Sequence, residues 1–185
     1  MSIQIGETPG RPYRLAPTDM TQVQADLVSR IRSGPRKDLP VNMEIWLHSP
    51  QFAEVANQFA EYVGHLAPMT RRVKEITILV VAAYWSSAFE QFWHERLGSN
   101  LGLTREQLEN LRARRYTYFD DEIEQTAYEV AIGLLEKRNV DYALYERAIR
   151  VLGHGGVSDL VGLIGLYTMV AFSLDFYQVP IPDIS

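Results

Sequence analysis

Glu90 and His94 are the two residues whose types and spacing best suggest chemistry in this chain. They lie four positions apart in a segment that begins at Ser86-Ser87 and has the character of a helix. This spacing sets a carboxylate and an imidazole side by side on one helix face, with Cβ atoms about 5–6 Å apart. A carboxylate favours the charged imidazole while burial opposes it, so the pair is a candidate proton donor or acceptor near neutral pH.

Glu75 is a third candidate, because it lies on the preceding helix. The stretch Ile76–Ala83 is almost entirely apolar, which is typical of a helix buried on most sides. If the chain turns near Trp85, Glu75 and His94 lie at similar distances before and after the turn. At a rise of about 1.5 Å per residue, an antiparallel hairpin would place them at nearly the same height. The hairpin Thr70–Leu97 is therefore predicted to bring two carboxylates and one imidazole together.

Simpler interpretations of the same residues remain open. Ser87 and Glu90 match the capping box S-x-x-E, in which both side chains only bond the helix backbone. Glu75 can form a surface ion pair with Arg71 or Arg72, one turn earlier. The helix N-terminus at Ser87 nevertheless has free N–H groups and partial positive charge, which suit an anionic ligand.

A metal site is a further alternative, with Glu75, Glu90 and His94 as three ligands. Four-helix di-metal proteins use Glu-x-x-His, at spacing three and in two copies. Here the spacing is four and no second copy is present. We therefore predict neither a metal nor another cofactor.

Composition sets broad limits on the class of protein. The chain has 185 residues, 46% of them hydrophobic, which is enough for one domain with a real core. The net charge of −5 and the lack of a long basic run make nucleic acid an unexpected partner. The chain has no cysteine, which excludes disulfides, zinc–thiolate sites and thiol-based redox chemistry.

No signal-peptide pattern is present at the N-terminus, and Leu160–Leu174, the longest charge-free apolar stretch, is shorter than the ~20 residues that span a bilayer. We interpret this stretch as a buried helix, either central in the monomer or at a subunit interface. The protein is expected to be soluble, cytoplasmic and not bound to a membrane.

Helix start and stop signals divide the chain, and no segment alternates at period two, so the fold class is predicted to be all-α. Residues 1–17, rich in proline and glycine, are predicted to form an irregular arm, and residues 18–185 a single domain. The expected helices are 18–33, 41–48, 50–67, the hairpin 70–98, 104–114, 122–137, 142–152 and 158–177, with caps at Thr18, Thr70, Thr104, Asp120 or Asp121, Asp141 and Ser158.

The hairpin resembles the signature of the carboxymuconolactone decarboxylase family, which includes the alkylhydroperoxidase D (AhpD) proteins. The matching residues are Arg72, Glu75, the apolar run Ile76–Ala83, Glu90 and His94; Leu47–Pro50 and Gly156–Pro182 also resemble the family. The resemblance implies an AhpD-like all-helical fold that assembles as homotrimers or hexamers.

One departure from the family decides which chemistry is possible. The thiol-active members have a Cys-x-x-Cys pair whose cysteines would fall on Ser87 and Glu90, while the residues that relay protons would fall on Glu75 and His94. This chain keeps the relay residues and lacks the thiols, so peroxidase activity of that type is excluded.

The decarboxylase members need no cysteine, and they act on a small lactone of aromatic catabolism. The resemblance therefore implies an acid–base enzyme acting on a small anionic organic acid or lactone. His94 would transfer the proton, with Glu75 and Glu90 as the other catalytic residues and Arg71, Arg72 and Ser87 binding the substrate. The alternative is a non-catalytic ligand-binding or structural oligomer that has lost its chemistry on the same scaffold.

Overall fold

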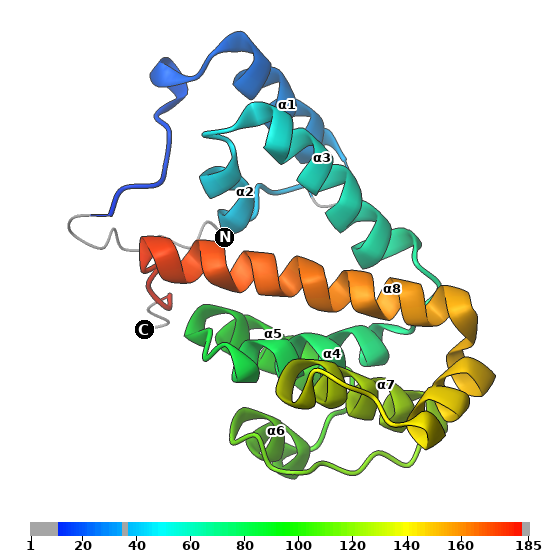
Figure 1. Cartoon of the computed structure of the whole chain (residues 1–185). Helices are drawn as coiled ribbons and strands as arrows, with labels where there is room; N and C mark the ends of the chain where they lie inside the picture. Colours follow the sequence, from blue (N-terminus) through cyan, green and yellow to red (C-terminus); the bar gives the residue numbers. More distant parts are fainter. Residues whose placement is uncertain (1–10, 35–36, 183–185) are drawn as a thin grey trace.

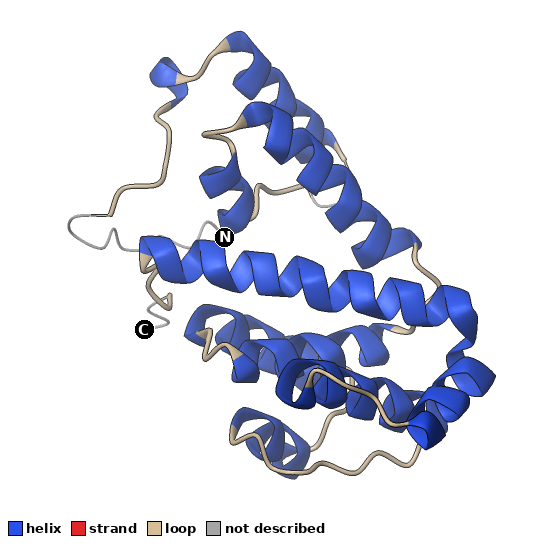
Figure 2. Ribbon diagram, in the orientation of Figure 1, coloured by secondary structure: helices blue, strands red, loops and turns tan. Residues whose placement is uncertain are grey.

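The computed structural model describes residues 11–34 and 37–182, and over these residues the fold is all-helical, with no strand (Figures 1 and 2). A short 3₁₀ turn, η1 (Pro17–Asp19), comes first. The helices are α1 (Gln22–Ser33), α2 (Val41–Trp46), α3 (Pro50–Glu61), α4 (Arg71–Tyr84), α5 (Ala88–Asn100), α6 (Arg105–Arg112), α7 (Glu122–Ile132) and α8 (Tyr142–Tyr177). Two π-helical turns, η2 (Tyr62–Leu66) and η3 (Gly133–Lys137), extend α3 and α7.

Helix α8 runs across the middle of the molecule, between α1–α3 on one side and α4–α7 on the other (Figure 1). It contributes to two apolar cores. On one side, residues of α1, α2 and α3 share a core with residues of the C-terminal half of α8 such as Leu166 and Leu174. On the other side, residues of α4, α6 and α7 share a core with the stretch around Leu160 and Ile164. The hairpin of α4 and α5 lies beside α8, so its polar residues stand close to where the two cores meet.

Helix starts follow the sequence signals in most places. The side chains of Thr70, Thr104, Asp121 and Asp141 cap α4, α6, α7 and α8, as predicted. The predicted start of α1 is wrong, because Thr21 caps it with a capping box to Gln24. Thr21 is the better cap because its side chain accepts a hydrogen bond from the backbone N–H of Gln24, while the Gln24 side chain accepts one from the backbone N–H of Thr21. The hairpin also continues past Gly98, to Asn100.

The last two predicted helices form one kinked element. Gly153 has the non-helical dihedrals φ 71° and ψ 167°, and the helix resumes directly after it. Ser158 is therefore inside the helix, where its hydroxyl donates to the carbonyl of His154, and it is not a cap. A left-handed φ at this position requires glycine, which explains why the chain bends here.

Helix α3 faces the core with its small residues, not with its large ones. Ala53, Ala56 and Ala60 are buried, whereas Phe52 and Val55 are exposed. Small residues allow α3 to lie close to its neighbours, and the large apolar side chains are left on the surface. Gly162 of α8 has the Phe59 ring against it, whereas no side chain or neighbouring backbone of the described residues lies within 4 Å of the Cβ position of Gly165.

Helix α8 is long and apolar enough to span a membrane by length and composition alone, a test that the core helix of a soluble protein also passes. Its position between the two cores agrees with a core helix. The division into an arm and one domain stays a prediction, and residues 1–10 of that arm lie outside the described residues.

Candidate functional site

The turn between α4 and α5 is tight and is fixed against α8. Trp85 ends α4, Ser86 adopts a left-handed φ of 57°, and Ser87 begins α5. The Trp85 indole N–H donates to the hydroxyl of Thr168 on α8 at 3.1 Å. This anchor sets how far α5 runs antiparallel to α4, and so which of their residues face each other.

Glu75 of α4 and His94 of α5 meet as the hairpin geometry requires. His94 Nδ1 lies 2.7 Å from Glu75 Oε2, and the two side chains are only 14% and 13% exposed. The Tyr167 ring of α8 stands edge-on to the imidazole, with ring centroids 5.2 Å apart. The carboxylate and the aromatic ring hold the imidazole in one orientation. Among the described residues no hydrogen bond involves His94 Nε2, so that nitrogen is available to a ligand.

Glu90 lies one turn before His94 and is almost fully buried, at 3% exposure. Neither of its carboxyl oxygens has a hydrogen-bond partner in the described part of the chain, and the same holds for Ser87 Oγ. Burial raises the pKa of Glu90 to about 8, with a smaller contribution from the negative charge of Asp175. The nearby Ser87 hydroxyl opposes this shift in pKa, although no well-formed hydrogen bond joins the two side chains.

The alternative interpretation of Ser87 and Glu90 as a capping box is therefore wrong, since Ser87 makes no side-chain cap bond. Both side chains are buried and are not bonded to the backbone ends of α5. With a pKa of about 8, Glu90 is mostly a neutral carboxylic acid at pH 7.

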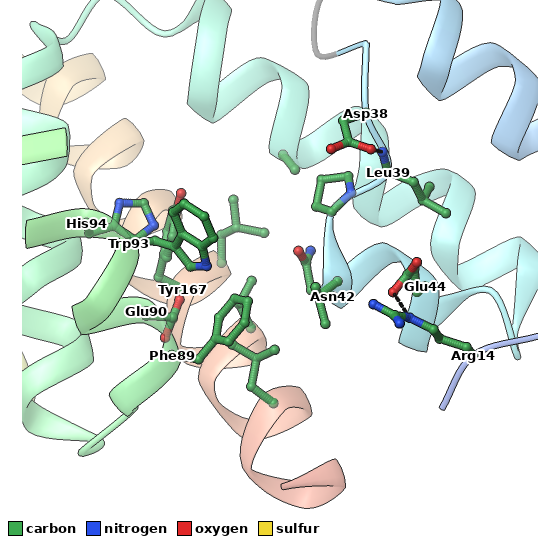
Figure 3. Close-up of a pocket in the computed structure, with 16 residues that line it drawn as sticks. Arg14, Asp38, Leu39, Asn42, Glu44, Phe89, Glu90, Trp93, His94 and Tyr167 are labelled. Atoms are coloured by element: carbon green, nitrogen blue, oxygen red, sulfur yellow. Dashed lines mark hydrogen bonds and ion pairs between the residues drawn. The ribbon is translucent and has the colours of Figure 1, made fainter. Parts of the chain in front are cut away.

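A cavity of about 440 Å³ opens beside these residues, and we call it the aromatic cavity. Phe89, Glu90 and Trp93 of α5 form one wall with His94 and Tyr167, and the Arg14–Glu44 pair, Asp38 and Asn42 face them from the other side (Figure 3). Its remaining lining is aliphatic, from residues such as Leu166, Val170 and Leu174. Its volume suits one small organic molecule.

A second cavity, of about 480 Å³, lies on the other side of His94, and we call it the basic cavity. Its lining includes Arg71, Lys74 and Glu75. His94 and Tyr167 line both cavities and form a partition between them. Lys74 is buried and donates to the carbonyls of Gly64 and Ala67, at 3.0 and 3.2 Å, and burial lowers its pKa. Since Lys74 is occupied in this way, Arg71 is the cation of this cavity best placed to meet a ligand.

Arg72 does not reach either cavity, contrary to the prediction that it binds substrate. Its guanidinium donates to both carboxyl oxygens of Glu124, at 2.6 and 3.0 Å, and to the carbonyl of Leu101 at 3.2 Å. This bidentate pair ties α4 to α7, so Arg72 has a structural role. Glu75 pairs with neither Arg71 nor Arg72, because His94 occupies its carboxylate.

Comparison with protein-family profiles gives no match, and no curated protein sequence matches the chain either. Solved structures do match. The apo debrominase Bmp8 aligns with a TM-score of 0.69 at 11% identity, over 91% of this chain and 90% of its own. An alanine-for-cysteine variant of Bmp8 in complex with 2,3,4-tribromopyrrole aligns with a TM-score of 0.70 at 11% identity, over 96% and 94%. ATU0492 from Agrobacterium tumefaciens, described as a putative antioxidant defence protein AhpD, gives 0.64 at 13%, over 75% and 95%.

The protein has the AhpD-like fold. This confirms the fold that the resemblance implied, on structural grounds that are independent of the sequence pattern. The match to Bmp8 covers nearly the whole of both chains, so α1–α3 belong to the shared architecture as much as the hairpin does.

In this cysteine-free AhpD-like protein, the described residues contain no group of three or more histidine and acidic side chains placed to hold a metal ion. Glu75 and His94 bond each other, and Glu90 stands apart with its oxygens unbonded. The arrangement is that of an oriented imidazole next to a protonated acid, which suits proton transfer.

Sequence reasoning missed several residues of the site. Trp93 and Phe89 line the aromatic cavity from α5, beside the candidate residues of the same helix. Their helical positions next to Glu90 and His94 were the available signal. Tyr167 and Asn42 come from distant segments, and only the packing of α2 and α8 against the hairpin brings them to the site.

Proposed function

We propose that this AhpD-like protein is an acid–base enzyme that acts on a small organic acid or lactone, with a decarboxylation as its reaction. The observation that carries the proposal is the Glu75–His94 pair, at 2.7 Å, whose imidazole lies in the wall of a cavity that the buried Glu90 also lines. Oriented imidazoles of this kind are general acids and bases in many enzymes.

In the proposed reaction, the bond between the substrate carbon and its carboxylate breaks and carbon dioxide leaves. The electron pair moves into a conjugated carbonyl group and forms an enolate. His94, as an imidazolium, then donates its Nε2 proton to the carbon, which restores the carbonyl compound. Glu75 is the residue that orients the ring through Nδ1 and stabilises its positive charge.

The charge of Glu90 bears on whether an anionic substrate is acceptable. Two ionised carboxylates next to an anion would repel it. Since the pKa of Glu90 is about 8, this group is mostly uncharged at pH 7, and Glu75 is paired with His94, whose imidazolium form offsets the carboxylate charge. Arg71, in the basic cavity on the far side of His94, is proposed to attract the substrate carboxylate.

The debrominase neighbour supports the size and shape of the ligand. Its variant was solved with 2,3,4-tribromopyrrole, a small planar ring. We infer that the aromatic cavity of this protein accepts a ring of comparable size, of the kind found in aromatic catabolism. The absence of cysteine means that thiol chemistry is not part of the proposal.

The test is a pair of matched histidine variants assayed for carbon dioxide release from a panel of lactone and keto acids. His94→Gln should lower turnover by about 10²–10⁴-fold, the usual contribution of one general acid. His154→Gln, at an exposed position remote from both cavities, should leave turnover unchanged. Circular dichroism of both variants confirms folding. Equal turnover by wild type and His94→Gln would refute the acid–base role.

A further inference from the structure

Glu90 and Ser87 are two neighbouring buried side chains whose polar atoms make no well-formed hydrogen bond with any described residue. Leaving a buried donor or acceptor unpaired costs about 1–3 kcal/mol, so natural proteins rarely tolerate two neighbouring cases without a reason. Glu90 is among the residues that line the aromatic cavity (Figure 3), and its two carboxyl oxygens are buried without a hydrogen-bond partner in the described chain. This is the pattern of a group whose partner is the ligand.

The walls of the cavity restrict what that ligand can be. Phe89, Trp93 and Tyr167 offer aromatic faces, and Leu166, Val170 and Leu174 add aliphatic surface, so a planar ring fits better than a strongly hydrated polar molecule. Arg14, the cation in the lining, is already paired with Glu44 at 2.9 Å. The cavity therefore favours an uncharged ring or the uncharged part of a larger substrate.

We propose that Glu90, held as a neutral carboxylic acid, donates a hydrogen bond to the carbonyl oxygen of a planar cyclic substrate and to the enolate oxygen that forms from it. This inference rests on the proposed function and deepens it, because it gives the substrate class: ring carbonyl compounds that carry the carboxylate on a saturated carbon next to that carbonyl, or on a saturated carbon linked to it through a C=C bond. His94 supplies the proton to carbon, and Glu90 binds the oxygen on which negative charge develops. Such placement of a donor in a site shielded from water is an efficient way to stabilise an enolate.

The bond strengthens as the reaction proceeds, since an oxygen that becomes negative accepts a hydrogen bond more strongly than a neutral carbonyl does. Glu90 keeps its proton throughout. Carbon dioxide leaves, the electron pair of the broken bond reaches the oxygen, and protonation at carbon by His94 returns that pair. Ketosteroid isomerase likewise keeps a carboxylic acid neutral in an apolar site so that it can donate a hydrogen bond of this kind.

Several other ionisable groups face Glu90 and enter its pH dependence. Asp175 of α8 contributes negative charge, and its own pKa is raised by burial. The remaining groups of the cavity and its surroundings are His94 and Tyr167 on the same wall, Glu75 behind His94, and Arg14, Asp38 and Glu44 on the opposite side. A substitution confined to Glu90 separates its contribution from theirs.

The test is a binding experiment with N-methyl-2-pyridone, a planar ring with a carbonyl acceptor, no hydrogen-bond donor and no ionisation in the range used. Quenching of tryptophan fluorescence reports binding, and loss of the signal in Trp93→Phe places the ligand in the aromatic cavity. With a pKa of about 8, the neutral fraction of Glu90 falls about 30-fold between pH 7 and pH 9.5, so the affinity of wild type should fall by fivefold to about 30-fold.

Two variants make the result decisive. Glu90→Gln keeps a donor and an acceptor but does not ionise, so it should bind the pyridone at pH 7 within about threefold of wild type and lose the pH dependence. Glu90→Leu has a similar bulk and no donor, so it should bind about tenfold more weakly at pH 7. Wild-type binding that does not change with pH, or equal binding by Glu90→Leu, would overturn the proposal.

The outcome is distinguishable from that of the proposed function. His94→Gln should lose turnover, while the fall in its pyridone affinity between pH 7 and pH 9.5, which Glu90 causes, should remain as in wild type, so a failure of acid–base catalysis leaves the binding result intact. Conversely, turnover that depends on His94 together with pH-independent binding would keep the proposed function and discard the role of Glu90.

Discussion

Replacing Glu90 with a residue that cannot ionise should stabilise the folded protein relative to wild type by an amount that grows with pH. The folded state raises the pKa of Glu90 from its ordinary 4.5 to about 8. Between these values the unfolded chain releases a proton that the folded chain retains. Stability is therefore greatest below pH 4.5 and is lost as the pH rises toward 8, which is the opposite of what a salt-bridged carboxylate does.

The size of the effect follows from the same two values. One pKa unit corresponds to about 1.4 kcal/mol, so the buried acid costs about 1 kcal/mol at pH 5 and about 3 kcal/mol at pH 7. Glu90→Gln removes the ionisation while keeping the shape. Any cost of burying the amide is independent of pH, so the difference in free energy of unfolding between the two proteins should widen by about 2 kcal/mol over this range. For a chain of this length that is a relative gain of about 4–8 °C in Tm.

Urea denaturation of wild type and Glu90→Gln at half-unit steps from about pH 5 to about pH 8.5 measures this difference directly. Glu109→Gln is the matched control, because Glu109 is exposed on α6 beside Arg105 and its pKa is lowered. Its stability curve should run parallel to that of wild type in this range. Parallel curves for wild type and Glu90→Gln as well would refute the account of Glu90 as a buried neutral acid.

Two further predictions concern the fold and its assembly. Gly153→Ala should destabilise the protein by about 1–2 kcal/mol, because alanine is strained at φ 71° and no described atom lies near enough to add a clash. Gly155→Ala, on the helix beyond the kink with equally open space, should be neutral or stabilising. Thermal melts compare the two variants, and equal effects would contradict the backbone explanation. We also propose that the open groove of about 480 Å³ along α8, where no described residue packs on Gly165, binds a second copy of this chain in a homotrimer or hexamer. Light scattering should show that Phe176→Glu dissociates the assembly, while Tyr142→Glu, equally exposed at 72% but outside the groove, leaves it intact; an unchanged mass for both would count against this surface.

Local signals predicted the helices well because capping and apolar periodicity act over a few residues. Thr70, Thr104 and Asp141 begin their helices as their residue types indicate. The errors arose where two local signals compete or where tertiary packing decides. Thr21, not Thr18, caps α1, because Thr21 has a glutamine three positions later. Ser158 is not a cap, because Gly153 bends the chain without ending the helix.

In the site as well, features set by local spacing were predictable from the sequence, and features set by tertiary packing were not. The heights of Glu75 and His94 follow from helix rise, so their contact was predictable from spacing alone. The structural role of Arg72 was not predictable, because nothing in the hairpin sequence indicates that Glu124 of α7 lies close enough to pair with it. The large apolar residues of α3 form a clear stripe, yet the choice between core and surface depended on how closely alanines let that helix approach its neighbours.

The start of α5 lacks the bonded side-chain cap that most of the described helices have, and it lies one turn before residues that line the cavity. α2 begins after Pro40, which has no side chain able to cap. α1, α4, α6, α7 and α8 each begin with a bonded side-chain cap. Ser49 at the start of α3 makes no cap bond either, but it is exposed and water can satisfy its hydroxyl. Ser87 is buried, so solvent water does not reach its hydroxyl, and no described residue bonds to it. Sequences that satisfy local rules elsewhere and violate them at one buried place usually do so for function. A bound carbonyl oxygen at Glu90 would supply the partner that this place lacks.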